Sequence, residues 1–311
     1  MKVLLIGNGG RENAMAWKIC QSTLLTQLYV APGNAGTAQI AKNINIASDD
    51  LDSIINFALE KKIDLVAIGP EVPLAKGLSD KCKENGIRCF GPSKFASQLE
   101  SSKQFAKSIM SACGIPSARS VSATSVKEAV HALDLFSMPT VIKADGLAAG
   151  KGVFICTSKE EAQNAITDIL DKKIFGDSGN TVIIEEFLEG PEISVFAFTD
   201  GTSISSLIGA CDYKRIGDGD TGPNTGGMGA YSPAPFWNKS FEKNILDTVF
   251  RKIIDYMNIN HDGYVGVLFA GLIITKDGPK VLEFNCRLGD PETQSIMPLL
   301  ETDLLQIMDH C

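Results

Sequence analysis

The first third of the chain alternates short apolar runs with helix-like segments, and this alternation restricts the folds open to it. The apolar runs lie at residues 3–7, 44–47 and 65–68, and the helix-like segments that follow them lie at residues 13–21, 51–62 and 74–84. Parallel strands need a long crossover between them, and a helix is the usual one. The pattern therefore predicts an α/β domain built on a parallel sheet.

The pattern changes after the Cys-Phe-Gly-Pro-Ser string at residues 89–93. Helical stretches around residues 96–113 end at a Gly-Ile-Pro break, and we place a domain boundary near Ser101. Beyond it, strand-like runs stand at residues 141–144, 152–156, 181–187, 193–198, 206–210, 265–274 and 280–284, with helix-like stretches at 159–170 and 241–257. This order predicts a mixed α+β unit with hairpins, arranged in two lobes.

Composition excludes several classes of function. Lysine and arginine number 29 against 37 acidic residues, giving a formal charge of −8 without long runs of one sign, so we expect no nucleic-acid partner. The longest apolar stretches fall short of the about 20 residues that span a bilayer, so we expect a cytoplasmic protein without membrane contact. Eight scattered cysteines and three histidines favour neither disulfides nor zinc. No obligate protein partner is predicted.

A glycine-rich string, Gly-Asn-Gly-Gly-Arg-Glu at residues 7–12, joins the first strand to the first helix. Free backbone amides and the helix dipole suit an anion there. A dinucleotide site is disfavoured, because Glu12 replaces the third fingerprint glycine and the second strand ends without a ribose-binding acid. We predict a loop for phosphate or a small substrate, with a second turn at residues 32–37 on the same sheet edge. A plain tight turn is the alternative.

A second loop, at residues 143–153, carries a lysine near each end. Lys143 ends one strand, Lys151 precedes the next, and glycine and alanine dominate between them. The loop joins strand to strand and no Lys-Ser/Thr pair opens a helix, so it is not a P-loop. We predict a hairpin lid over a triphosphate, whereas two solvated lysines would be the plain alternative.

Two further segments indicate ligand contacts. Residues 182–192 are a buried strand followed by a polar hinge, whose backbone could meet an adenine edge while Glu192 accepts from ribose hydroxyls. Residues 217–229 contain more glycines than a simple connection needs. We predict a long loop there that wraps a ligand.

The last segment, around residues 281–293, holds the densest polar set. Glu283, Asn285 and Arg287 alternate and so share one strand face, while Phe284 points to the core. A carboxylate beside an amide oxygen suits Mg²⁺, which usually keeps nucleotide phosphates in its shell. Arg287 is suited to a carboxylate or a transferring phosphoryl group. An exposed polar strand face is the plain alternative.

These residues resemble a known family. The lysine hairpin, the Glu-Glu-Phe-Leu hinge at 185–188 and Glu-Phe-Asn at 283–285 resemble the ATP-grasp ligases. The strings at 9–12, 32–37, 224–231 and 289–293 resemble the phosphoribosylamine-glycine ligases, the glycinamide ribonucleotide synthetases, along essentially the whole chain. The resemblance implies ligation of glycine to 5-phosphoribosylamine through glycyl phosphate, yielding glycinamide ribonucleotide, ADP and phosphate in purine biosynthesis.

The resemblance also implies an architecture and residue roles. It implies an N-terminal Rossmann-like (pre-ATP-grasp) substrate-binding domain at residues 1–101. An ATP-grasp domain would follow at residues 102–311, with a small lid subdomain at about residues 117–188. The family's C-terminal domain would be absent. ATP would contact Lys103, Lys143, Lys151, Glu185, Glu186, Leu188 and Glu192. Mg²⁺ or Mn²⁺ would bind Glu283 and Asn285. The two substrates would contact Gly9, Gly10, Asn34, Arg215, Thr225, Gly226 and Met228, and the reaction centre would comprise Lys214, Arg287 and Asp290.

Asn13 departs from the family, whose members often carry histidine after Gly-Gly-Arg-Glu. Two alternatives stay open. Another ATP-grasp carboxylate-amine ligase, or biotin carboxylase, would share the nucleotide and metal residues without the strings at 224–229 and 289–293. A truncated MgATP-binding fragment would bind nucleotide without turnover.

Overall fold

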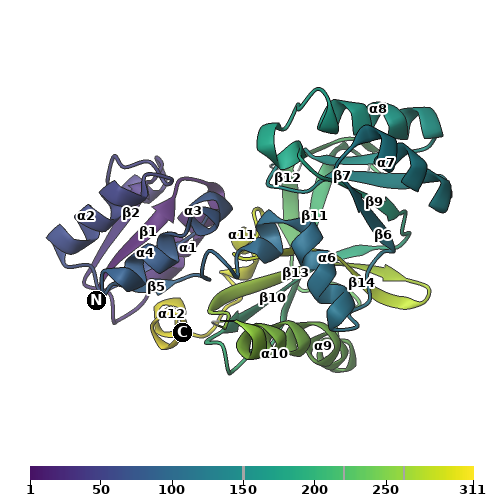
Figure 1. Ribbon diagram of the computed structural model, residues 1–311. Coiled ribbons are helices and arrows are strands. Elements are labelled where there is room, and N and C mark those ends of the chain that lie inside the picture. Colours follow the sequence, from purple (N-terminus) through teal and green to yellow (C-terminus); the bar gives the residue numbers. More distant parts are fainter. Residues whose placement is uncertain (149–150, 220, 262) are drawn as a thin grey trace.

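The computed structural model describes residues 1–148, 151–219, 221–261 and 263–311. Its N-terminal part is a five-stranded parallel sheet in the order β3-β2-β1-β4-β5 (Figure 1). The strands are β1 Lys2–Gly7, β2 Gln27–Pro32, β3 Lys42–Asn43, β4 Leu65–Ile68 and β5 Arg88–Phe90. Its helices are α1 Gly10–Ile19, the 3₁₀ turn Thr37–Gln39, α2 Leu51–Lys61, α3 Glu71–Lys76 and α4 Leu78–Glu84. The predicted parallel α/β sheet is confirmed.

Two predicted elements of this sheet need correction. The strand predicted at 44–47 is wrong: β3 lies just before it and is only two residues long, paired at the sheet edge with Tyr29 and Val30. The helix predicted at 74–84 begins earlier and is two helices, because Gly77 between them has a φ of +90°. Glycine adopts this left-handed conformation without the Cβ penalty, and it ends α3 as a C-cap.

The rest of the chain forms two antiparallel sheets. The larger has the order β12-β11-β10-β13-β14 and the smaller β6-β9-β7-β8. Their strands are β6 Ser120–Ala123, β7 Thr140–Ala144, β8 Val153–Cys156, β9 Val182–Glu186, β10 Glu192–Thr199, β11 Ile208–Gly217, β12 Thr221–Tyr231, β13 Gly266–Thr275 and β14 Gly278–Asn285. The predicted α+β unit with hairpins is confirmed.

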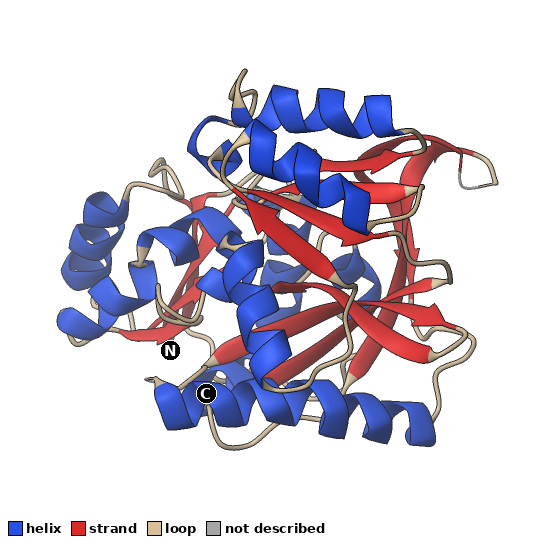
Figure 2. Cartoon of the chain, turned by 45° about the vertical axis from the view of Figure 1, so that its right-hand side comes forward, coloured by secondary structure: helices blue, strands red, loops and turns tan. Residues whose placement is uncertain are grey.

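Helices cover both sheets. They are α5 Gln98–Ser101, α6 Lys103–Ala112, α7 Val126–Ala132, α8 Lys159–Leu170, α9 Lys239–Ile245, α10 Arg251–Asn260, α11 Glu292–Ile296 and α12 Leu304–His310, with 3₁₀ turns at Leu133–Leu135 and Gly176–Gly179 and a π turn at Leu246–Phe250. Figure 2 shows α7 and α8 over the smaller sheet and α9 and α10 beneath the larger one. Within the described residues, no helix is long and apolar enough to span a membrane.

The glycine-rich segment predicted as a loop is instead strand β12. It pairs with β11, and the register shifts between Tyr213 and Arg215 and again before Gly217. The ladder supplies hydrogen bonds that offset the entropic cost of ordering glycine, and the shifts are bulges that bend the hairpin. Strand β6 was not predicted either, because its Ser-Val-Ser-Ala sequence is short and half polar.

The three hydrophobic clusters do not correspond one to one with the three sheets. Two clusters span the N-terminal sheet and the larger sheet together, and Phe90 of β5 lies with its ring centroid 6.3 Å from that of Phe198 of β10. A third cluster is confined to the smaller sheet with α7 and α8. The smaller sheet therefore has a core of its own.

Candidate active site

The smaller sheet presents a buried carboxylate shared by two lysines. Glu185 of β9 accepts from Lys143 Nζ of β7 at 2.7 Å and from Lys107 Nζ of α6 at 3.0 Å. The side chains of Glu185 and Lys143 are 3% and 9% exposed, so these charges are held away from bulk water. Lys143 Nζ also lies 3.5 Å from the Leu282 carbonyl, beside the polar end of β14.

Lys103 begins α6 and faces the end of β7. Its Nζ donates to the carbonyls of Asp145 and Gly146 at 3.3 and 3.2 Å. Asp145 in turn accepts from the Gln104 amide at 2.7 Å, which fixes the first turn of the helix against the connection that follows β7. Burial lowers the pKa of Lys103 against the attraction of Glu283. A partly dehydrated ammonium group of this kind is well placed for an anionic ligand.

The predicted hairpin joins β7 to β8, with Lys143 opposite Val153. Lys151 precedes β8 and is exposed, while residues 149–150 of the predicted glycine loop lie outside the described residues. The strand-to-strand connection that separates this loop from a P-loop is confirmed.

The hinge after β9 carries the remaining predicted nucleotide residues. Glu186 accepts from the Arg119 amide at 2.9 Å, and Leu188 is half-buried. Glu192, at the start of β10, pairs with Lys214 Nζ of β11 at 3.1 Å. The Glu185 carboxylate faces the two lysines, and the Glu185 carbonyl accepts from Thr140 Oγ1 at 2.8 Å.

The end of β14 carries Glu283 and Asn285, as predicted, with Phe284 buried in the core between them. Desolvation opposes ionisation of Glu283, but Lys214, Lys143, Lys103 and Arg287 outweigh it and lower its pKa. The predicted phosphate and reaction-centre cations therefore all favour the charged form of this carboxylate. Glu283 itself makes no ion pair within the part of the chain that is described.

The side-chain oxygens at the end of β14 fit a divalent metal whose remaining ligands are water and phosphate oxygens. Glu283 and Asn285 supply two oxygen-bearing side chains, and the described residues contain no cluster of three or more His, Cys, Asp or Glu able to hold a metal. Mg²⁺ seldom uses an all-protein cage and completes its octahedron with water and phosphate oxygens. Asn285 Oδ1 accepts from Arg287 Nη2 at 3.2 Å, which orients the amide.

Arg287 is held by two carboxylates that sequence reasoning missed. Its Nη2 lies 2.8 Å from Glu100 of α5, and its Nε lies 3.4 Å from Glu71 of α3. Glu100 also accepts from the Cys286 amide at 2.8 Å. Burial raises the pKa of Glu100 against the pull of Arg287. Both acids are remote in sequence from β14, and no local pattern around them indicated this contact.

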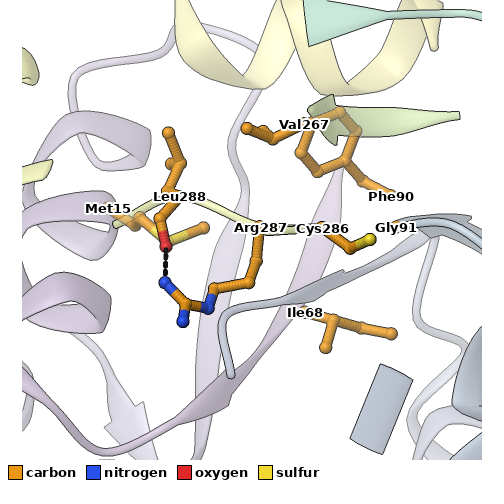
Figure 3. A pocket seen from close by; sticks show the side chains of 8 residues that line it. All are labelled: Met15, Ile68, Phe90, Gly91, Val267, Cys286, Arg287 and Leu288. Atoms are coloured by element: carbon orange, nitrogen blue, oxygen red, sulfur yellow. Dashed lines mark hydrogen bonds between the residues drawn. The ribbon is translucent and has the colours of Figure 1, made fainter. Parts of the chain in front are cut away.

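A cavity of about 10 Å³ lies beside Arg287, between the N-terminal sheet and the chain after β14 (Figure 3). It is lined by Met15, Ile68, Phe90, Gly91, Val267, Cys286, Arg287 and Leu288. Figure 3 shows the guanidinium turned away from the apolar side chains, with Nη1 donating to the Leu288 carbonyl at 3.2 Å. The space admits one water at most, so it is a packing gap at the domain junction.

The first glycine loop is organised by Glu12. Its carboxylate accepts from the Gly9 amide at 2.6 Å and from Arg11 Nε at 2.5 Å, and it is almost fully buried. A Cβ on Gly69 would lie 2.1 Å from its Oε1. Glu12 therefore fills the place that a dinucleotide fold keeps open with its third glycine.

The second turn locks onto the first through Asn34. Its Nδ2 donates to the carbonyls of Asn8 and Gly9, both at 3.0 Å, and its Oδ1 accepts from Gly36 and Thr37 amides. Asn13, the departure from the resembled family, packs under Gly36, and its buried Oδ1 has no hydrogen-bond partner among the described residues.

The N-terminal loop touches the turn after β14. Cβ atoms on Gly9 and Gly10 would lie 3.1 Å from Asp290 Oδ2 and 2.8 Å from Gln294 Nε2, respectively. Gln294 Nε2 donates to Asp290 Oδ1 at 2.6 Å. Two of the predicted substrate residues and one predicted reaction-centre residue are thus neighbours.

The β11–β12 hairpin carries the other predicted substrate residues. Thr225 Oγ1 donates to the Lys214 carbonyl at 2.8 Å, and Arg215 is half-buried on β11. Gly226 and Met228 are exposed. The structure therefore ties Thr225 to Lys214, whereas Met228 projects from the hairpin into solvent.

Gly227 is the point where this hairpin meets the Asp290 turn, and Gly227→Ala should disturb it. Gly227 has a φ of +114°, and a Cβ there would lie 2.4 Å from Pro291 Cδ. We expect a loss of about 1–3 kcal/mol in the free energy of unfolding from backbone strain and steric clash. Urea unfolding measures it, with Gly229→Ala as control because a Cβ there meets no atom within 4 Å. Equal stability of the two variants would contradict the contact.

Asp212 lies on β11 beside Lys214, whose Nζ is 3.8 Å from its Oδ2. Burial raises the pKa of Asp212 to about 6, with Lys214 opposing the rise and Glu292 and Glu192 adding to it. Glu292 is itself buried and accepts from Ser194 Oγ at 2.7 Å. Negative charge is therefore crowded on this part of the larger sheet.

The raised pKa makes stability depend on pH. The charged form of Asp212 lowers the free energy of unfolding, and this destabilisation is largest above pH 6. It decreases as the pH falls toward the ordinary pKa of an aspartate, near 4. Asp212→Asn should therefore raise the free energy of unfolding relative to wild type by about 1–2 kcal/mol more at pH 8 than at pH 4.5. Urea unfolding of both proteins at the two pH values measures this difference. A pH-independent difference would contradict the assignment.

These features identify the fold class of the protein. An antiparallel sheet bearing a metal-type carboxylate–amide pair faces a smaller lysine-bearing sheet, and residues 101–293 match the family description "Phosphoribosylglycinamide synthetase, ATP-grasp (A) domain". This is an ATP-grasp fold. Residues 1–100 match the corresponding "N domain" description, and the chain belongs to the phosphoribosylglycinamide synthetase family.

Individual relatives agree with this family. The phosphoribosylamine-glycine ligase of Nostoc sp. is 49% identical over 314 residues, covering 100% of this chain and 74% of the relative. The trifunctional purine biosynthetic protein adenosine-3 of Gallus gallus is 52% identical over 99% of this chain, which spans 31% of that protein. The crystal structure of the Thermotoga maritima phosphoribosylamine-glycine ligase matches with a TM-score of 0.81 at 34% identity, covering 94% of this chain and 71% of that one.

Proposed function

We propose that this chain ligates glycine to 5-phosphoribosylamine, using ATP and passing through glycyl phosphate, to give glycinamide ribonucleotide, ADP and phosphate. The observation that carries the proposal is the position of two cations at the end of β14, where Lys143 Nζ lies 3.5 Å from the Leu282 carbonyl and Arg287 Nη2 donates to Asn285 Oδ1 at 3.2 Å. Together with Lys103 and Lys214, these cations lower the pKa of Glu283. Four cations around one metal-type carboxylate suit a triphosphate and an acyl phosphate. Membership of the family supports the choice of substrates.

Each part of the site has a task in this proposal. Lys103 and Lys143 bind and orient the transferring phosphate between the lid and the larger sheet. Lys214 and Arg287 stabilise the negative charge that develops on glycine's carboxylate as it is phosphorylated. Asp290 lies against Gly9 and Gly10, and so orders the junction where the amine of phosphoribosylamine meets the acyl group. Catalysis is then mostly positioning and electrostatic stabilisation.

Glu283 and Asn285 would hold Mg²⁺ or Mn²⁺, which neutralises phosphate charge when bound. In the same proposal, the nucleotide is framed by Lys151, Glu186, Leu188 and Glu192, and Glu185 orients Lys143 toward its phosphates. Gly9, Gly10, Asn34, Arg215, Thr225, Gly226 and Met228 serve the two substrates. We also propose a domain division at residue 101, a lid about 117–188 and a cytoplasmic location, in keeping with eight unpaired cysteines.

The test is phosphate release from ATP, with and without freshly generated 5-phosphoribosylamine, glycine and Mg²⁺. A phosphoribosylamine-glycine ligase such as that of Nostoc sp. serves as positive control. Release that requires both substrates is the expected result. MgATP binding without such release would favour a nucleotide-binding unit, and release with another carboxylate or amine would favour a different ATP-grasp ligase.

A further inference from the structure

Lys107 is a buried charge that the proposed reaction does not yet use. Its side chain is 11% exposed, and its Nζ donates to Glu185 Oε1 and to the Ala118 carbonyl, both at 3.0 Å. Glu185 Oε2 faces Lys143 at 2.7 Å. One carboxylate therefore lies between two ammonium groups, each of which engages a different oxygen.

The charge balance of this triad matters to Lys143. With Lys107 present, the three groups sum to one positive charge, so an anion near Lys143 meets a net attraction. Without Lys107, Glu185 would neutralise Lys143 completely. In a buried cluster, the loss of one charge is screened far less than at the surface.

The backbone explains how Lys107 comes to this position. Lys103 and Lys107 are four residues apart on α6 and so share one helix face. On β9, Glu185 lies opposite Val141, two residues before Lys143 on β7, so the carboxylate and Lys143 project from the same face of the smaller sheet. Helix α6 thus presents one lysine to the end of β7 and a second to Glu185.

We propose that Lys107 is a positioning residue that occupies one oxygen of Glu185 and so leaves the charge of Lys143 available to nucleotide phosphate. This inference rests on the proposed ATP site. Lys107 is not placed in contact with nucleotide. It acts through Glu185, by balancing part of the negative charge that this carboxylate presents to Lys143.

The test is direct binding of MgADP and of a non-hydrolysable MgATP analogue by isothermal titration calorimetry, which needs no ligase turnover. Lys107→Met should weaken binding of the triphosphate analogue at least about tenfold, because the triad then carries no net charge. Lys107→Arg should keep binding close to wild type. Lys252→Met is the matched control, since Lys252 also donates to a backbone carbonyl, that of Gly114 at 3.0 Å, but through a solvent-exposed hydrogen bond. Circular dichroism and urea unfolding establish that each variant is folded.

A double variant separates this role from a structural one. In Lys107→Met with Glu185→Gln, the triad regains one positive charge, and triphosphate binding should recover at least in part relative to Lys107→Met alone. A merely structural lysine predicts the opposite, because the second substitution removes another buried contact.

The outcomes discriminate between the two proposals. Wild-type affinity in Lys107→Met, or a double variant no better than the single one, would overturn the role of Lys107 while leaving the ligase proposal intact. Absence of nucleotide binding by the wild-type chain would overturn the ATP site and this inference with it. Weak binding in Lys107→Met with recovery in the double variant would support the inference even if glycine-dependent turnover were absent.

Discussion

Glu283→Gln is expected to lower MgATP-dependent ligase activity at least about 100-fold while the protein stays folded. The substitution keeps the shape of the side chain but removes the negative charge that Lys103, Lys143, Lys214 and Arg287 favour. Glu283 forms no ion pair with the described residues, so the substitution breaks no direct ion pair.

The measurement is steady-state phosphate release over a series of Mg²⁺ concentrations, together with urea unfolding. Glu84→Gln, which changes an exposed carboxylate at the end of α4, is the control and should match wild type. Because the four cations lower the pKa of Glu283, its charge supports the folded state above its ordinary pKa near 4.5 and loses that effect as the pH falls. Wild-type turnover in Glu283→Gln would refute the metal assignment.

The parallel sheet could be predicted from sequence because its strands are buried on both faces. Residues of β1 and β4 form continuous apolar runs, and such runs stand out against the polar turns around them. The two-residue β3 and the half-polar β6 carry no such signal. Their pairing partners, rather than their own residues, make them strands.

The high glycine content of β12 led to the wrong prediction of a loop. A run of glycines indicates a loop when only the cost of ordering the backbone is considered. In the structure the ladder with β11 orders the segment, and Gly227 is required by its close approach to Pro291. The glycines permit tight contact between a strand and a turn, which sequence reasoning interpreted as freedom to wrap a ligand.

In the candidate site too, some residues carry a local sequence signal and others are identified only by their contacts in the folded protein. Glu283, Asn285 and Lys143 could be proposed from the sequence because strand alternation and loop chemistry are local. Glu71 and Glu100 were missed because Arg287 meets them only once the N-terminal sheet and β14 are packed together. For Lys107 a local signal existed, since it follows Lys103 by one helical turn, but its partner Glu185 is distant in sequence.

Arg287→Met is expected to have the largest effect on stability, a loss of about 3–5 kcal/mol in the free energy of unfolding, and to abolish ligase activity. Arg287 is 16% exposed, and its removal leaves Glu100, which is 7% exposed, without its 2.8 Å partner. A buried carboxylate without a counter-charge is costly, whereas a carboxylate and a guanidinium removed together are often replaced at little cost.

Two further variants test that reason. Arg287→Met combined with Glu100→Gln should recover part of the lost stability, because the uncompensated charge is gone, but no activity. Arg287→Lys keeps the charge yet cannot contact Glu100, Glu71 and Asn285 together, so stability should be intermediate. Burial already raises the pKa of Glu100, and without Arg287 it should rise further, so the stability lost in Arg287→Met should be smaller at pH 5 than at pH 8. Urea unfolding at both pH values decides the matter, and a loss below about 1 kcal/mol at pH 8 would mean that Arg287 is not the counter-charge on which this junction depends.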